Sequence, residues 1–114
     1  MILEAVIIYH LETVASLHTS RHTHVEVCGR VSLVRKEEDG DIHIRLSDDE
    51  GRFIIAEIVP YRPLPKPKLN QNICVLGIHR YDAEHGWDEV HPVESIRDAD
   101  KRRRDKVHSD RERR

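Results

Sequence analysis

The side chains best suited to chemistry in this sequence are imidazoles and carboxylates at strand-like spacing. They are Asp41, His43, Glu57, His85, Glu89 and His91. Asp41 and His43 form one i, i+2 pair and Glu89 and His91 form another, and residues at this spacing share one face of a β-strand. Such donors are typical ligands of zinc or manganese, and carboxylate-held imidazoles also act as acid and base in hydrolysis. The pattern therefore predicts a divalent transition-metal site (Zn or Mn) or a His/carboxylate-dependent hydrolytic site.

The same alternation is also typical of any solvent-facing sheet surface. The sequence has no closely spaced ligand motif such as CxxC or HExxH. The position of Glu57 depends on the turn at residues 48–51. A two-residue turn sets Glu57 opposite Ile42, towards the core, whereas one extra residue sets it opposite His43, beside the other polar groups. Because a buried carboxylate needs a partner, the turn decides whether Glu57 belongs to the site.

The composition indicates one globular domain with an uneven charge distribution. Of its 114 residues, 35% are charged and 38% are hydrophobic, and residues 101–114 carry +5 whereas residues 1–100 carry −7. Only the basic end matches a phosphate backbone. No apolar run approaches the roughly 18 residues of a membrane-spanning helix, and the N-terminus lacks the basic start of a secretory signal. We expect a cytoplasmic protein with no membrane partner, in which Cys28 and Cys74 are buried free thiols, with a disulfide between them as the less favoured alternative.

Apolar periodicity predicts five β-strands. They are expected at residues 25–36, 41–47, 52–59, 73–79 and 87–93. Asp39-Gly40 predicts a hairpin with either a two-residue turn or a three-residue loop and glycine bulge, and the second sets Val34 opposite Ile44. Gly29 predicts a bend that lets the long first strand serve both ends of a small barrel. Residues 60–67 contain four prolines and predict an extended surface connection.

The strands are predicted to form one barrel flanked by two extensions. We divide the chain into an N-terminal extension (1–23), a barrel (24–93) and a charged, basic C-terminal tail (94–114). The extension is expected to start extended and to contain a short helix from about Leu11 to His18, although its β-branched residues also suit a strand. The tail is expected to be a fraying helix or a disordered arm.

This order of five strands resembles the OB fold over residues 24–93. The resemblance implies an all-β, antiparallel barrel, although the proline-rich run stands where OB folds usually have a helix. An SH3-like barrel and an antiparallel sandwich are the alternatives. A narrower resemblance is to an uncharacterised family of small prokaryotic proteins, and it implies a shared fold without a known reaction. Its motifs are Asp39-Gly40-Asp41-Ile42-His43, Ala56-Glu57-Ile58-Val59-Pro60 and His85-Gly86-Trp87-Asp88-Glu89-Val90-His91-Pro92-Val93.

The OB resemblance makes single-stranded nucleic acid the first expected partner, because many OB folds combine basic residues with aromatic rings that stack on bases. The candidate residues are Arg45, Arg80, Tyr81, Trp87, Arg102, Arg103 and Arg104. Tyr81 and Trp87 flank the loop between the last two strands, where OB folds bind ligands. The competing interpretation is that Trp87 and Phe53 pack in the core or shield its rim. The metal or hydrolytic site is the alternative function. A third is a structural or adaptor protein, whose residues 60–67 could dock on a protein partner.

Overall fold

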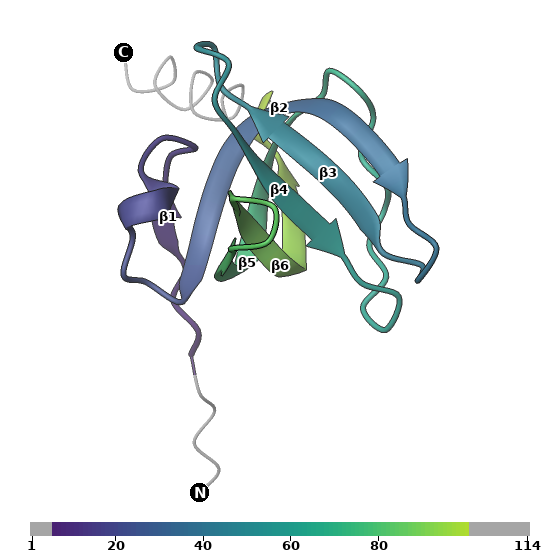
Figure 1. The fold of residues 1–114 in the computed structure, drawn as a ribbon, viewed down its shortest axis with the longest axis horizontal. Helices are drawn as coiled ribbons and strands as arrows, with labels where there is room; N and C mark the ends of the chain where they lie inside the picture. Colours follow the sequence, from purple (N-terminus) through teal and green to yellow (C-terminus); the bar gives the residue numbers. More distant parts are fainter. Residues whose placement is uncertain (1–5, 101–114) are drawn as a thin grey trace, which may run out of the picture.

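The computed structural model describes residues 6–100, which form a closed five-stranded β-barrel with one extra strand (Figure 1). The strands are β1 (His10–Glu12), β2 (His24–Lys36), β3 (Ile42–Ser47), β4 (Phe53–Ile58), β5 (Asn72–Asp82) and β6 (Trp87–Asp98). Their order is β1-β2-β3-β4-β6-β5, and pairing of β2 with β5 closes the barrel. The predicted all-β class and barrel are confirmed. In this part of the chain no helix has the length and apolar character to cross a membrane.

The long strand β2 serves both sides of the barrel, as its glycine predicted. Residues 30–36 pair with β3 and residues 24–30 pair with β5, and Figure 1 shows the ribbon of β2 arching from one side to the other. A Cβ atom on Gly29 would lie 3.1 Å from the carbonyl oxygen of Ser47. Glycine at this position therefore avoids crowding between β2 and the end of β3.

The loop between β2 and β3 has three residues rather than two. The N–H of Glu37 donates a hydrogen bond to the carbonyl of Asp41 (2.7 Å), and Gly40 has a φ of 92°. Val34 lies opposite Ile44. The register is therefore the one expected for a three-residue loop with a glycine bulge, and the two-residue turn is wrong.

The barrel is not antiparallel throughout, which corrects the prediction. β4 and β6 run parallel, with Ile55 opposite Glu89 and Ala56 opposite Val90, and β1 runs parallel to β2. β2 and β4 run the same way because both are antiparallel to β3, and β2 and β6 run the same way because both are antiparallel to β5, so β4 and β6 are parallel where they pair. The proline-rich connection before β5 contains no helix.

The inward-facing side chains form a core that includes Val25, Val27, Val31, Ile44, Leu46, Ile54, Ile73, Val75, Val90 and Val93.

The predicted helix from Leu11 to His18 is wrong. His10–Glu12 is a strand, and only a single 3-10 turn follows, at Leu17–Thr19. The side chains of Thr13 and Ser16 each accept a hydrogen bond from the backbone N–H of the other, at 3.0 and 2.9 Å. Such local side-chain bonds compete with helical ones, and the free edge of β2 offers the preceding residues a strand partner.

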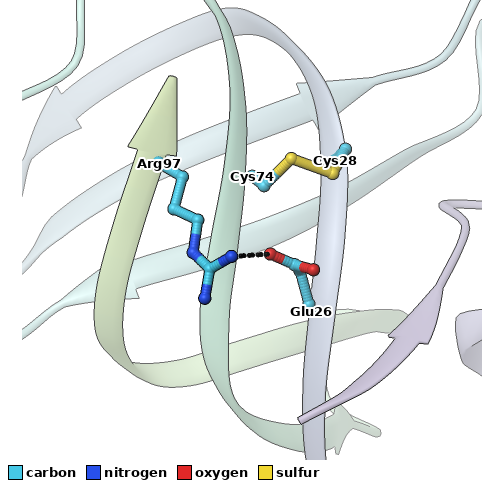
Figure 2. The surroundings of a disulfide bond; sticks show 4 residues. All are labelled: Glu26, Cys28, Cys74 and Arg97. Atoms are coloured by element: carbon cyan, nitrogen blue, oxygen red, sulfur yellow. Dashed lines mark ion pairs between the residues drawn. A yellow bond between two sulfur atoms is a disulfide. The ribbon is translucent and has the colours of Figure 1, made fainter. Parts of the chain in front are cut away.

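The prediction of free thiols is also wrong, because Cys28 and Cys74 lie directly opposite each other on β2 and β5 and form a disulfide. Figure 2 shows this bond with the Glu26 carboxylate and the Arg97 guanidinium beside it, 3.8 Å apart. Arg97 lies on β6, which continues to Asp98. The first residues assigned to the tail are therefore part of the sheet, and residues 101–114 lie outside the described range.

Candidate functional site

Three rows of side chains cross the outer face of β3, β4 and β6. The register of β3 with β4 and of β4 with β6 sets neighbouring side chains side by side, while the residues between them point into the core. The rows are an aromatic row of Ser47, Phe53 and Trp87, a middle row of Arg45, Ile55 and Glu89, and a histidine row of His43, Glu57 and His91. Six of the thirteen predicted site residues therefore share one surface.

The histidine row is centred on Glu57, which the β3–β4 register places opposite His43. One carboxylate oxygen of Glu57 (Oε1) contacts Nε2 of His43, and the other (Oε2) contacts Nδ1 of His91. Glu57 is only 5% exposed. The longer of the two turns considered at residues 48–51 is therefore the one that forms, and Glu57 belongs to the polar surface.

Burial dominates the electrostatics of this row. The pKa of Glu57 is raised to about 7, mainly by burial; His91 lowers the pKa, and the carboxylates of Glu89 and Asp41 raise it. Within residues 6–100, the ion pairs of Glu57 and Glu89 are with histidines only. Near neutral pH the row therefore has a carboxyl group able to exchange a proton with imidazole or to bind a cation.

Five of the six predicted metal ligands come together here. Their donor atoms form two sets, each within 4.8 Å, that share Glu57: one is Asp41, His43 and Glu57, and the other is Glu57, Glu89 and His91. The sixth residue, His85, lies at the aromatic row instead. Its Nδ1 is 2.7 Å from a carboxylate oxygen of Asp82, and its ring stacks on that of Trp87 with centroids 4.5 Å apart.

The aromatic row combines two rings with a cation. The rings of Phe53 and Trp87 meet edge to face at 6.3 Å, and the guanidinium carbon of Arg45 lies 5.8 Å from the Phe53 centroid. Phe53 is 42% exposed, so it packs on the rim and not in the core. The Trp87 Nε1–H donates a hydrogen bond to Glu89 (2.8 Å), which joins the aromatic row to the acidic groups.

The other predicted nucleic-acid residues separate into two groups. In the β5–β6 pairing, Arg80 lies opposite Glu89, whereas Tyr81 lies opposite Asp88. Arg80 therefore faces the same side of the hairpin as Trp87, and Tyr81 faces the other side, where its ring contacts His18 at 5.3 Å. Tyr81 and Trp87 do not form one stacking surface. The remaining three, Arg102, Arg103 and Arg104, lie outside the described residues.

A second histidine–carboxylate group was missed by the sequence reasoning. Asp88 bridges Nδ1 of His18 and Nε2 of His79, each at 2.9 Å from one of its carboxylate oxygens. His79 and Asp88 could have been paired from the β5–β6 hairpin alone. His18 carries no sequence signal for this contact, because it reaches Asp88 only after the N-terminal segment folds against the barrel.

Because His85 stacks on Trp87, the fluorescence of Trp87 should report the protonation of His85. The hydrogen bond with Asp82 raises the pKa of His85 above its ordinary value of about 6.5, so the imidazolium persists to higher pH. Trp87 is the single tryptophan of the chain, and a protonated imidazole quenches indole emission more than a neutral one. We expect the emission to rise with pH through a midpoint above about 6.5.

Two variants assign that midpoint. Asp82→Asn should move it to lower pH, because the carboxylate that favours the imidazolium is gone. His85→Gln should remove the transition. A transition that persists unchanged in His85→Gln would show that another group near Trp87 controls the emission.

No protein-family model and no curated protein matches this chain. Among solved structures it is similar to OBody AM1L10 bound to hen egg-white lysozyme (TM-score 0.60, 17% identity, 82% of this chain and 96% of that chain). It is also similar to the telomere capping protein Ten1 from S. pombe (0.59, 16%, 93% and 99%) and to a chain of the S. pombe Stn1–Ten1 complex (0.59, 17%, 96% and 96%). Together with the closed five-stranded barrel, these likenesses identify the fold as an OB fold.

Proposed function

We propose that this chain binds single-stranded nucleic acid on the outer face of β3, β4 and β6. The observation that supports this most strongly is the aromatic row, in which Phe53 and Trp87 lie beside Arg45. β3 and β4 are the second and third strands of the barrel, and that face is where OB folds bind oligonucleotides. In this proposal the two rings stack on bases and Arg45 contacts a phosphate.

The surroundings of Arg45 suit that role. Its Nε–H donates a hydrogen bond to the Ser32 hydroxyl (2.9 Å), which holds the guanidinium beside the Phe53 ring. A groove of about 600 Å³ opens here. Its lining consists of Arg30, Ser32, Arg45, Ser47, Asp48, Asp49, Gly51 and Phe53. A base stacked on Phe53 would place its phosphate near Arg45 without a change in the strand.

Charge predicts a moderate, salt-sensitive affinity. Residues 1–100 carry −7, and Asp48 beside the groove already pairs with Arg52 at 2.7 Å. Stacking must then supply most of the binding energy of the barrel itself. The +5 of residues 101–114 adds attraction to the phosphate backbone that salt screens.

The test measures binding of a fluorescent oligothymidine, several nucleotides longer than the roughly 4–16 that one OB fold covers, at low salt. Trp87→Ala should weaken binding roughly 5- to 150-fold, because one stacked base contributes about 1–3 kcal/mol. Tyr81→Ala is the matched control. It removes an exposed aromatic ring from the same hairpin on the side that faces away from Trp87, and it should leave the affinity unchanged.

Salt and truncation complete the test. The affinity should fall steeply with salt, and removal of residues 101–114 should reduce both the affinity and the salt dependence. Absence of binding at low salt, or equal losses for Tyr81→Ala and Trp87→Ala, would contradict the proposal. A protein partner would then be the better candidate for this surface, since two of the similar structures are protein complexes.

A further inference from the structure

We propose that Glu57, Glu89 and His91 bind one divalent transition-metal ion, Zn²⁺ or Mn²⁺, across the seam between β4 and β6. This site uses the histidine row and Glu89 of the same face, not the two aromatic rings, and the proposal does not depend on nucleic-acid binding. One ligand comes from β4 and two come from β6. The ion would therefore join β4 to β6, whose pairing connects strands β2, β3 and β4 to the β5–β6 hairpin.

The donor atoms already converge as such an ion requires. Nδ1 of His91 contacts Oε2 of Glu57 and lies 3.6 Å from Oε1 of Glu89. All three ligand atoms lie within 4.8 Å of one another. Zinc–ligand bonds of about 2.0–2.2 Å place tetrahedral ligands roughly 3.3–3.6 Å apart, so small side-chain movements suffice to surround an ion.

The outer partners of these ligands also fit a metal centre. The Trp87 Nε1–H donates to Oε2 of Glu89 at 2.8 Å, which leaves Oε1 of Glu89 facing His91. His43 contacts the other oxygen of Glu57 and orients that carboxylate in the same way. Hydrogen bonds of this kind fix the direction of metal ligands. The free coordination positions would be filled by water.

The charges of Glu57 and Glu89 give a thermodynamic reason for a cation to bind at this site. Glu57 and Glu89 are only 5% and 6% exposed, and adjacent buried carboxylates repel each other. Within residues 6–100 neither has an ion pair with lysine or arginine. A divalent cation would offset both charges, and one imidazole with two carboxylates is a donor set that suits zinc and manganese better than magnesium.

The short seam explains why an ion would matter here. β4 and β6 are paired only at Ile55–Glu89 and Ala56–Val90, whereas the neighbouring pairings of β3 with β4 and of β5 with β6 are much longer. Coordination by Glu57 and His91 would extend the connection beyond these pairs. Metal binding should therefore raise the melting temperature of the barrel.

The experiment uses the full chain stripped with EDTA and then dialysed. Zn²⁺, Mn²⁺ and Mg²⁺ are titrated separately by calorimetry, with thermal unfolding and the absorption of a Co²⁺-loaded sample as further readouts. We expect about one Zn²⁺ or Mn²⁺ per chain, a higher melting temperature and little response to Mg²⁺. Glu89→Gln, which keeps an acceptor for Trp87, should weaken binding at least about 100-fold, as should His91→Asn.

His79→Asn is the matched control. It disrupts the other histidine–carboxylate group, in which His18 and His79 lie on opposite oxygens of Asp88 and which is not among the two converging sets of donors found in residues 6–100. Metal binding should survive this change. The proposal is overturned if the stripped wild-type chain binds neither Zn²⁺ nor Mn²⁺. It is also overturned if Glu89→Gln and His91→Asn, folded by circular dichroism, bind as tightly as the wild type and His79→Asn.

Discussion

Reduction of the Cys28–Cys74 disulfide is expected to lower the free energy of unfolding by about 4 kcal/mol. The two residues are 46 positions apart in the sequence, and a cross-link over a loop of this length restricts the unfolded chain strongly. The bond also connects β2 to β5, the pairing that closes the barrel. Its loss should therefore lower the stability of the barrel while leaving the side chains on the outer face of β3, β4 and β6 unchanged.

Urea unfolding followed by Trp87 emission, with and without a phosphine reductant, measures this loss. A Cys28→Ser/Cys74→Ser double variant is the control, because it should match the reduced wild type and show no response to the reductant. Titration of free thiols in the unfolded protein verifies the starting state. Equal urea midpoints for oxidised and reduced wild type would contradict the prediction.

The same bond bears on where the protein works. Disulfides persist in oxidising compartments and in some hyperthermophiles, and they are rare in the cytosol of mesophiles. The cytoplasmic location expected from the sequence stays a prediction. If the protein is cytoplasmic in a mesophilic organism, the barrel must function with Cys28 and Cys74 reduced. The free energy of unfolding of the reduced form then determines its stability in the cell.

Gly77→Ala is expected to lower the free energy of unfolding by about 3 kcal/mol or more, as overpacking against backbone does in its severe cases. A Cβ atom at Gly77 would lie 2.2 Å from the carbonyl oxygen of Pro92 and 2.8 Å from a methyl carbon of Val90. The β5–β6 register is already irregular on both sides of Gly77. The carbonyl belongs to the backbone of β6, so relief requires a shift of the whole strand.

Gly51→Ala provides the comparison for this variant. No atom lies within 4 Å of a Cβ at Gly51, but its φ is +81°, so only the cost of a left-handed backbone conformation, roughly 1–2 kcal/mol, applies. Thermal or urea unfolding of both variants measures the two losses in the free energy of unfolding. Their difference distinguishes the cost of steric crowding at Gly77 from the cost of backbone conformation at Gly51. Equal losses for the two would show that the contact with Pro92 is relieved without strain. Because Pro92, which a Cβ at Gly77 would meet, directly follows His91, the Gly77→Ala variant should also perturb the histidine row.

The barrel and part of the site could be predicted from local sequence patterns, namely apolar alternation and the positions of glycine and proline. The alternation after Asp39-Gly40, the bend at Gly29 and the prolines of residues 60–67 each constrain the backbone within a few residues. Those signals located the five barrel strands, except for the C-terminal ends of β5 and β6, and predicted that β2 pairs with two neighbours. For Glu57 the sequence left two orientations, into the core or on the outer face of the sheet. One additional residue in the turn at 48–51 changes the first into the second.

The features that escaped prediction depend on contacts between distant parts of the chain. The Cys28–Cys74 bond requires β5 to pair with the first half of β2, and no local pattern reports that register. The helix expected near Leu11 gave way to a strand because the edge of β2 was available. Likewise, Tyr81 and Trp87 are close in sequence, yet they face opposite sides of one hairpin, which only the register reveals.

The short strand β1 also affects how this barrel can meet other proteins. Residues His10–Glu12 pair with Val25–Val27 of β2, whose other edge is taken by β5. Exposed strand edges are where a partner adds a strand of its own, or where copies of a chain aggregate. Here the chain fills that edge itself. A partner that binds β2 by strand addition must first compete with His10–Glu12, so the N-terminal segment would act as an intramolecular competitor.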